Sequence, residues 1–197
     1  SAFIRINTQS KTFNKKGMNE MNTEILIAGF GGQGILFAGK FLAYEGLIEG
    51  RELSWLPSYG PEMRGGTANC SVILSDIPVG SPIVTNPDIL IAMNLPSLDK
   101  YEKETKAGGK IFVDSALIER KVKRTDVEAF YIPATKLASD EGLTGLANMI
   151  MIGFMIKHTN LCPIENIEAA MKKVVPASKQ HLLDANMKAV HLGYNFK

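Results

Sequence analysis

The residues with the clearest chemical potential are the glycines between positions 29 and 34. Gly29, Gly31 and Gly34 fit the spacing G-x-G-x-x-G, while Gly32 adds a fourth glycine and Gln33 a side-chain amide. Such a turn is too tight for side chains, and the helix after it points its first backbone N–H groups at whatever lies above. The stretch can therefore bind an anion or a polar partner surface. The alternative is that these glycines only let a helix pack closely on a strand.

A second candidate stretch runs from residue 58 to residue 67 and reads Ser-Tyr-Gly-Pro-Glu-Met-Arg-Gly-Gly-Thr. Gly60-Pro61 and Gly65-Gly66 disfavour any regular element, which predicts a shaped loop. Arg64 is the cation of this loop, and its guanidinium can bind two oxygens of a phosphate or carboxylate at once. A solvated arginine on an ordinary surface loop is the alternative.

Both stretches depend on elements that the hydrophobic pattern predicts. Residues 25–28 form a short apolar run typical of a buried strand, and apolar positions from 35 to about 47 recur at helical spacing. Strand, glycine turn and helix are the context that the G-x-G-x-x-G spacing requires. A second strand is expected over 52–56, directly before the loop that carries Arg64.

The rest of the chain alternates between strand-like and helix-like segments. Further strands are expected over 68–74, 83–84, 88–93, 110–114 and 127–132. Helices are expected over 98–105 and 143–158, from Pro163 onward, and from Ser178 to about Leu192, where Gly193 ends the last one. This alternation predicts an α/β fold with three layers, a mostly parallel sheet with helices on both faces and a Rossmann-like first βα unit.

Ligands bind open α/β sheets at the carboxyl ends of the parallel strands. The turn at 29–34, the loop at 58–67, Asn94 and Asp114-Ser115 should therefore gather at one edge. For Asn94 and Asp114, a role as helix caps after strands is at least as well supported by residue type.

A nicotinamide dinucleotide site would need an acidic residue at the end of the second strand, where it holds the ribose. Glu52 stands at the start of that strand, which runs into Trp55-Leu56-Pro57-Ser58 without an acid at its end. A stand-alone dinucleotide-binding oxidoreductase is therefore disfavoured, although it stays open as an alternative. A scaffold that binds no ligand is another.

Composition and charge exclude several other classes. The 197 residues suffice for one α/β domain with a real core, and a net charge of +2 gives no strong field for nucleic acid or a membrane surface. The longest apolar run, 149–156, is too short to span a bilayer.

The cysteines and histidines do not suggest a metal site. Cys70 and Cys162 are isolated, cannot hold a four-thiolate cluster or a structural zinc, and are expected as reduced, buried thiols of a cytoplasmic protein. His158, His181 and His191 are expected at helix ends or on the surface.

Two motifs in order, Gly29-Phe-Gly-Gly-Gln-Gly-Ile35 and Ser58-Tyr-Gly-Pro-Glu-Met-Arg-Gly-Gly66, resemble the gamma subunit of the 2-oxoacid:ferredoxin oxidoreductases, most of all the 2-oxoglutarate type. The resemblance covers roughly 21–195 and implies one pyruvate/ketoisovalerate oxidoreductase gamma-type domain over 21–197. Residues 1–20 are expected to be a tag remnant or a disordered extension. The implied complex decarboxylates a 2-oxoacid oxidatively, forming an acyl-CoA, CO₂ and reduced ferredoxin.

The resemblance also implies a division of labour between chains. The sequence lacks a Gly-Asp-Gly type diphosphate motif and the cysteine runs that clusters need. Thiamine diphosphate, Mg and the iron–sulfur clusters are thus expected in partner alpha, beta and delta subunits, with ferredoxin or another acceptor reached through the complex. The isolated chain should be inactive, and its substrate and stoichiometry are not encoded in its own motifs.

The role that the resemblance implies for this chain is help in binding coenzyme A. The expected groups are Gly29, Gly31, Gly32, Gln33 and Gly34 in the turn, and Tyr59, Glu62, Arg64, Gly65 and Gly66 in the loop. Within this set the turn offers backbone or amide groups, Arg64 offers charge, and Tyr59 and Glu62 shape the loop. The equal alternative is that both motifs only dock against the catalytic subunits.

Overall fold

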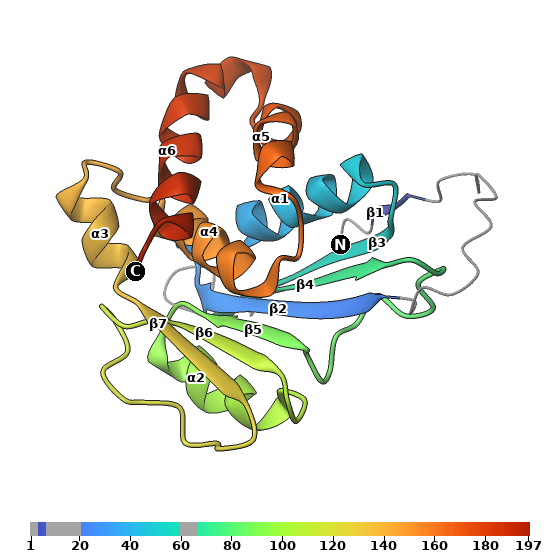
Figure 1. Ribbon diagram of the computed structural model, residues 1–197, viewed down its shortest axis with the longest axis vertical. Coiled ribbons are helices and arrows are strands. Elements are labelled where there is room, and N and C mark those ends of the chain that lie inside the picture. Colours follow the sequence, from blue (N-terminus) through green and yellow to red (C-terminus); the bar gives the residue numbers. More distant parts are fainter. Residues whose placement is uncertain (1–3, 7–20, 60–66) are drawn as a thin grey trace.

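The computed structural model describes residues 4–6, 21–59 and 67–197. At its centre is a seven-stranded sheet with the order β1-β3-β4-β2-β5-β6-β7 (Figure 1). The strands are β1 (Ile4–Ile6), β2 (Asn22–Phe30), β3 (Glu52–Tyr59), β4 (Thr67–Ser75), β5 (Ile89–Ala92), β6 (Lys110–Asp114) and β7 (Glu128–Ile132).

The sheet has a parallel half and an antiparallel half. β2, β5, β6 and β7 pair in parallel, whereas β4 is antiparallel to both β2 and β3, and β1 is antiparallel to β3. β3 consequently runs in the same direction as β2, so most strands share one direction, as the sequence predicts. The parallel half brings the carboxyl ends of β2, β5, β6 and β7 to one edge of the sheet.

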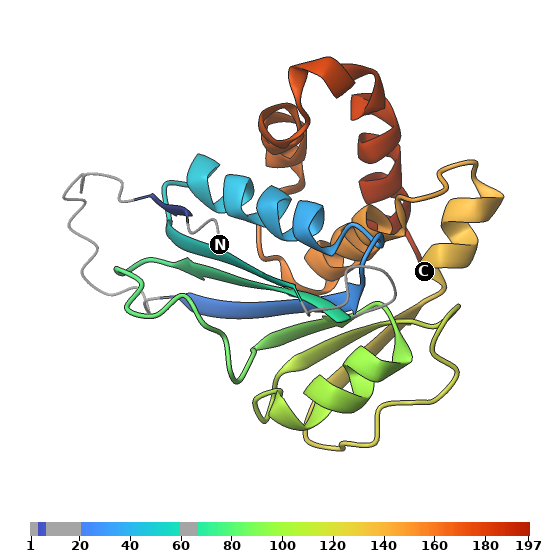
Figure 2. The same ribbon diagram turned by 180° about the vertical axis from the view of Figure 1, so that it is seen from behind.

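Helices cover both faces of the sheet and give the predicted three layers (Figures 1 and 2). α1 (Ile35–Ile48), α4 (Ala147–Thr159), α5 (Ile167–Val174) and α6 (Leu183–Tyr194) lie on one side, and α2 (Leu95–Tyr101) lies on the other. α3 (Ala134–Asp140) follows β7. Three short 3₁₀ helices complete the described part: η1 (Glu102–Glu104), η2 (Ile164–Asn166) and η3 (Ala177–Leu182).

Each face of the sheet has its own core because successive strand residues point to opposite sides. In β2, Ile25 and Ile27 pack with the core under α1 and α4, whereas Leu26 and Ala28 pack with the core under α2. Within α4, every residue from 148 to 156 is buried, which confirms the expectation of a helix apolar nearly all round. None of the helices in the described part combines the length and hydropathy that a membrane crossing requires.

The second strand is longer than the sequence predicts. β3 continues past Pro57 to Tyr59, so the irregular loop cannot begin at Ser58. Pro57 pairs with Cys70 of β4, while β1 covers only the part of β3 from Leu53 to Trp55. The described residues of β1 do not reach Pro57, and prolines are tolerated in strands where no neighbouring strand needs the missing N–H.

Three further elements differ from the prediction. Residues 83–84 are not a strand, and α2 begins at Leu95 because Asn94 caps it and Pro96 fits the first helical turn. α3 was not predicted, because Pro133 precedes it and only Ala134 and Ala138 are buried, which leaves no periodic signal.

The C-terminal helices also begin and end elsewhere. α5 starts at Ile167 after the 3₁₀ turn that follows Pro163. Ser178 lies within η3 and caps nothing, and α6 begins at Leu183. Gly193 lies inside α6 instead of ending it, because its missing side chain allows α4 to approach closely.

Candidate functional site

The glycine turn connects the end of β2 to the start of α1, as the sequence predicts. Gly32 and Gly34 have φ angles of 92° and 72°, in the left-handed region where side chains are strained. Gly31 and Gly32 are exposed, and a Cβ built at Gly32 would meet nothing within 4 Å. The turn therefore presents bare backbone at the carboxyl edge of the sheet.

Gly29 has a packing role instead of an exposed one. It is the buried penultimate residue of β2, and a Cβ there would lie 2.5 Å from Gln33 Oε1 and 2.9 Å from Met93 Cβ. No real Cβ tolerates such distances, so the glycine allows β5 and the turn to close around the end of β2. The need for close packing therefore explains why residue 29 is a glycine.

The side chain of Gln33 is used within the fold. Its Oε1 accepts from the Phe30 N–H at 2.6 Å, and its Nε2 donates to the Met93 carbonyl at 3.0 Å. The backbone N–H of Gln33 also donates to the Phe30 carbonyl at 3.2 Å. Gln33 thereby ties the end of β2 to the end of β5 and fixes the shape of the turn.

Asn148, a residue that the sequence analysis did not single out, braces the turn from the other side. Its Nδ2 donates to the Gly34 carbonyl at 3.0 Å, and a Cβ on Gly34 would lie 2.5 Å from that nitrogen. Asn148 is 4% exposed, and its Oδ1 has no hydrogen-bond partner among the described residues. The sequence feature that could have singled out Asn148 is that it is a lone amide at the start of an otherwise apolar helical run.

The N-terminus of α1 is left without side-chain compensation. Gly34 is its N-cap residue, none of the described side chains caps its first N–H groups, and its first turn contains no acidic residue. Helix N-termini carry a partial positive charge and unpaired N–H donors, which favour an anion or another acceptor. The arrangement can therefore bind a phosphate or carbonyl oxygen without any charged side chain.

Asn94 and Asp114 lie at the same edge, as expected, and both act as local caps. Asn94 Oδ1 accepts from the Ser97 N–H at 2.8 Å at the start of α2. The buried Asp114 accepts from the Ala116 N–H at 3.1 Å and from the N–H and hydroxyl of Thr135. Burial raises the pKa of Asp114. The cap interpretation therefore explains both residues.

Two cavities lie elsewhere in the described part of the chain. One of about 300 Å³ at the amino ends of the strands includes Asp88, Lys106 and Lys110 in its lining. The other, of about 430 Å³, includes Glu49 and Arg51. In both cavities the cations already form ion pairs with carboxylates, so neither cavity competes with the glycine turn as an anion site.

Comparison with known proteins shows the family to which the chain belongs. Residues 24–196 match the protein family described as pyruvate ferredoxin/flavodoxin oxidoreductase. The chain belongs to this family. Over 178 residues it is 38% identical to the 2-oxoglutarate synthase subunit KorC of Methanocaldococcus jannaschii, covering 89% of this chain and 94% of KorC.

Two further members of the family show how much of each relative this chain covers. The crystal structure of the keto/oxoacid ferredoxin oxidoreductase gamma subunit from Geobacter sulfurreducens superposes with a TM-score of 0.76 at 31% identity, covering 88% of this chain and 95% of that one. The ketoisovalerate oxidoreductase subunit VorA of Methanothermobacter marburgensis is 39% identical over 171 residues, which are 86% of this chain but 35% of VorA. The chain thus spans about a third of VorA.

The residues that the structure describes do not form a site for a metal ion or an iron–sulfur cluster. Cys70 lies buried in β4 and Cys162 is buried before η2, both as free thiols, and the described residues contain no group of three potential metal ligands. Burial raises the pKa of the Cys70 thiol to about 12. His158 lies at the end of α4 and packs against Phe130 and Phe154.

The second predicted stretch of the site is described only in part. Tyr59 is the last residue of β3, and the structure describes its backbone but not its side chain. Glu62, Arg64, Gly65 and Gly66 lie outside the described residues. Their contribution to the site stays a prediction from the sequence.

Proposed function

We propose that this chain is the non-redox gamma subunit of a coenzyme A-acylating 2-oxoacid:ferredoxin oxidoreductase, with 2-oxoglutarate as the first candidate substrate. The match to KorC over 94% of that subunit supports this assignment. In this proposal, alpha, beta and delta subunits in the cytoplasm hold thiamine diphosphate, Mg and the iron–sulfur clusters. These groups supply the decarboxylation and electron transfer, so the isolated chain is inactive.

The contribution of this chain is to hold coenzyme A through the uncapped N-terminus of α1. That helix end, with Gly31 and Gly32 exposed in front of it, is the observation that carries the proposal. Coenzyme A has phosphates and amide carbonyls, both of which accept from backbone N–H groups. Gln33 bonds the turn to the Met93 carbonyl after β5, Asn148 holds the turn from α4, and Arg64 adds a cation if its loop reaches the same ligand.

A matched pair of substitutions at Gly32 tests this role in the assembled complex. Asp and Asn both tolerate positive φ, so Gly32→Asp and Gly32→Asn differ mainly in charge. A carboxylate in front of the helix end should repel the phosphates and raise the KM for coenzyme A at least tenfold relative to Gly32→Asn. The KM for the 2-oxoacid should stay unchanged. Equal coenzyme A kinetics in the two assembled variants would rule the role out.

A substitution in the second stretch separates ligand binding from docking. In the assembled complex, Arg64→Ala should weaken coenzyme A affinity without reducing assembly. If assembly weakens while coenzyme A affinity is unchanged, the loop serves docking alone.

The dinucleotide alternative has a further structural argument against it. β4 lies between β2 and β3, so the end of the second strand is two strand spacings, about 10 Å, from the glycine turn. An acid at the end of β3 could not face a ribose held at the turn as it does in the dinucleotide fold. Titration of the isolated chain with NAD and NADP should therefore show no binding.

A further inference from the structure

The four segments that follow the parallel strands at the carboxyl edge lack charged residues, and Asp114, which ends β6 there, is buried. Four segments follow β2, β5, β6 and β7 there: 31–37, 93–97, 115–118 and 133–135. None of them contains Asp, Glu, Lys or Arg, although these types make up 21% of the chain. Gln33 donates to the carbonyl of Met93 and Ser115 donates to the carbonyl of Ile132, so these segments are tied to their neighbours at one edge of the sheet.

This edge exposes apolar side chains around the bare glycine turn. Leu95 is 40% exposed at the start of α2, and Leu117 is 45% exposed in the turn after β6. Their neighbours Pro96 and Ala116 are exposed as well. Two large leucines, a proline, an alanine and exposed glycine backbone thus share one edge of the sheet.

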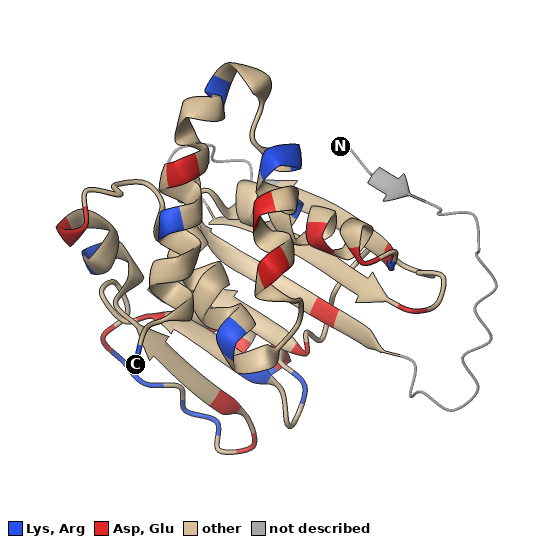
Figure 3. Ribbon diagram, turned by 45° about the horizontal axis from the view of Figure 1, so that its top comes forward, with Lys and Arg blue, Asp and Glu red and all other residues tan. Residues whose placement is uncertain are grey.

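The opposite edge of the sheet carries charged residues, so the depletion of charge is not a property of the whole sheet. At the amino ends of the strands, Lys106 lies 3.0 Å from both Glu24 and Asp88, and Lys110 pairs with Glu128. Residues 119–126, which return the chain from the carboxyl edge to the start of β7, carry charges of both signs (Figure 3). Depletion of charge together with exposed apolar side chains is typical of the centre of a protein–protein interface.

The family members indicate what covers such a surface. This unit accounts for 94% of KorC but only 35% of VorA, so it occurs both as a separate chain and as a third of a longer one. In VorA the remaining two thirds are covalently joined to it. A separate chain must hold the equivalent partner through surface contacts alone.

We propose that the carboxyl edge, defined by Leu95, Leu117 and the turn at 31–34, docks the subunit equivalent to the remaining two thirds of VorA. This inference rests on the proposed membership of the complex. Docking there buries both leucines and places the uncapped end of α1 at the boundary between two subunits. Coenzyme A is then held in a site that both chains complete.

Charge introduced at the two leucines tests the proposal. Leu95→Glu and Leu117→Glu each place a carboxylate in the interface, and Leu95→Glu does not harm α2 because acids are favourable in a first helical turn. Ile83→Glu is the matched control, because Ile83 is 59% exposed in the loop between β4 and β5, away from the carboxyl edge. Each variant is co-expressed anaerobically with the chain of the same organism that matches the rest of VorA.

Both leucine variants should raise the dissociation constant of the two chains at least tenfold, with Ile83→Glu within twofold of wild type. Wild-type association by both leucine variants, or equal loss in Ile83→Glu, would overturn the proposal. The proposal would also be overturned if the isolated chain formed a homodimer that Leu117→Glu dissociates, because a second copy of the chain would then cover this edge. If only Gly32→Asp changes coenzyme A kinetics while both leucine variants assemble normally, the proposed function stands and this docking surface fails.

Discussion

Asn148 of α4 donates its side-chain amide to the carbonyl oxygen of Gly34, 3.0 Å away, across 114 residues of sequence. Gly34 is the N-cap residue of α1, so this bond fixes the helix end that we propose for coenzyme A. The same amide occupies the space in which any side chain at position 34 would lie. The buried packing of α4 and the exposed turn are thereby coupled.

Replacing Asn148 with Ala should raise the KM for coenzyme A severalfold and cost about 1 kcal/mol of the free energy of unfolding. The turn loses its brace, so amide exchange over 31–37 should accelerate. Asn186→Ala is the control, since Asn186 is also 4% exposed, donates Nδ2 to a backbone carbonyl and leaves Oδ1 unpaired, but lies in α6. A similar loss of stability in both variants, with the same coenzyme A kinetics, would show that Asn148 is purely structural.

The turn was predictable because its geometry is encoded locally. The left-handed φ angles of Gly32 and Gly34 require glycine, and the strand and helix around them have clear hydrophobic patterns. β6, a continuous buried run, was also predicted with its observed bounds, 110–114. The first family motif, Gly29 to Ile35, contains this turn, whereas the second lies mostly outside the described residues.

The contacts made across the fold were not predictable from one sequence. Gln33 reaches Met93 over 60 residues, and Asn148 reaches Gly34 over 114. Gly193 was interpreted as a helix end because glycine often terminates helices. Only the packing of α6 on α4 shows that it is required inside the helix.

Gly153 and Gly193 make the contact between α4 and α6 possible, and either substitution by Ala should destabilise the fold. A Cβ on Gly153 would lie 1.9 Å from the Val190 carbonyl oxygen, and one on Gly193 would lie 1.9 Å from the Ile150 carbonyl oxygen. Because both neighbours are helix backbone, the helices must separate. Gly153→Ala should cost about 3 kcal/mol of the free energy of unfolding.

Gly80→Ala is the control for the helix contact, because a Cβ at Gly80 meets nothing within 4 Å. Urea denaturation of the isolated variants measures the difference. If Gly153→Ala were as stable as Gly80→Ala, α4 and α6 could not pack at this distance in solution.

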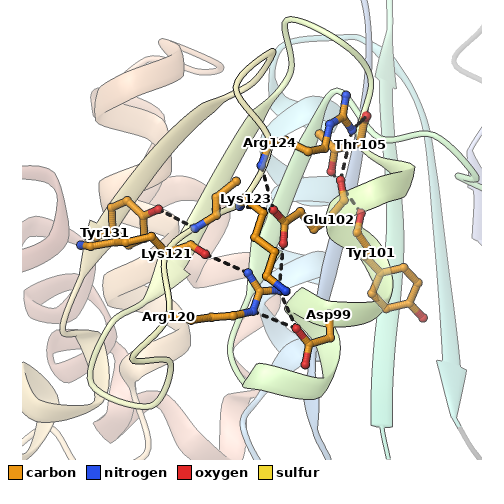
Figure 4. Close-up of polar contacts among 10 residues, drawn as sticks. Asp99, Tyr101, Glu102, Thr105, Arg120, Lys121, Lys123, Arg124 and Tyr131 are labelled. Carbon is orange, nitrogen blue, oxygen red and sulfur yellow. Dashed lines mark hydrogen bonds and ion pairs between the residues drawn. The ribbon is translucent and has the colours of Figure 1, made fainter.

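Glu102 of η1 holds the loop between β6 and β7, and its replacement by Gln should release that loop (Figure 4). Its Oε1 accepts from the N–H groups of Lys123 and Arg124, and its Oε2 lies 2.8 Å from Arg120. Although burial opposes ionisation, these hydrogen bonds outweigh it and lower the pKa of Glu102. Glu102→Gln should cost about 2 kcal/mol at pH 7.

The pH dependence of this effect has a definite sign. Because its pKa is lowered in the folded state, ionised Glu102 stabilises the fold at pH values above the ordinary pKa of a glutamate. This stabilisation is lost as the pH falls through the pKa that Glu102 has in the folded state. Hydrogen exchange over 120–126 should accelerate in Glu102→Gln at neutral pH and not in Glu104→Gln, which replaces another acid of η1. Equal exchange in both variants would show that the ion network does not hold the loop.

Glu45 should make the stability of the protein fall as the pH rises. Its side chain is fully buried in α1, and neither carboxylate oxygen has a hydrogen-bond partner among the described residues. Burial, and then the charge of Glu49, raise the pKa of Glu45 to about 7. The folded state therefore binds this proton more tightly than the unfolded chain does, so the contribution of Glu45 to stability is greatest below pH 4.5 and is lost as the pH rises to about 7.

Glu45→Gln removes this charge while keeping the shape of the side chain. At pH 8 it should be more stable than wild type by about 3 kcal/mol, since one pKa unit corresponds to about 1.4 kcal/mol, and the difference should shrink toward pH 5. Denaturation of both proteins between pH 5 and 8.5 measures this, with the exposed Glu119→Gln as the control. A constant offset between Glu45→Gln and wild type across that range would mean that Glu45 does not titrate there in the folded state.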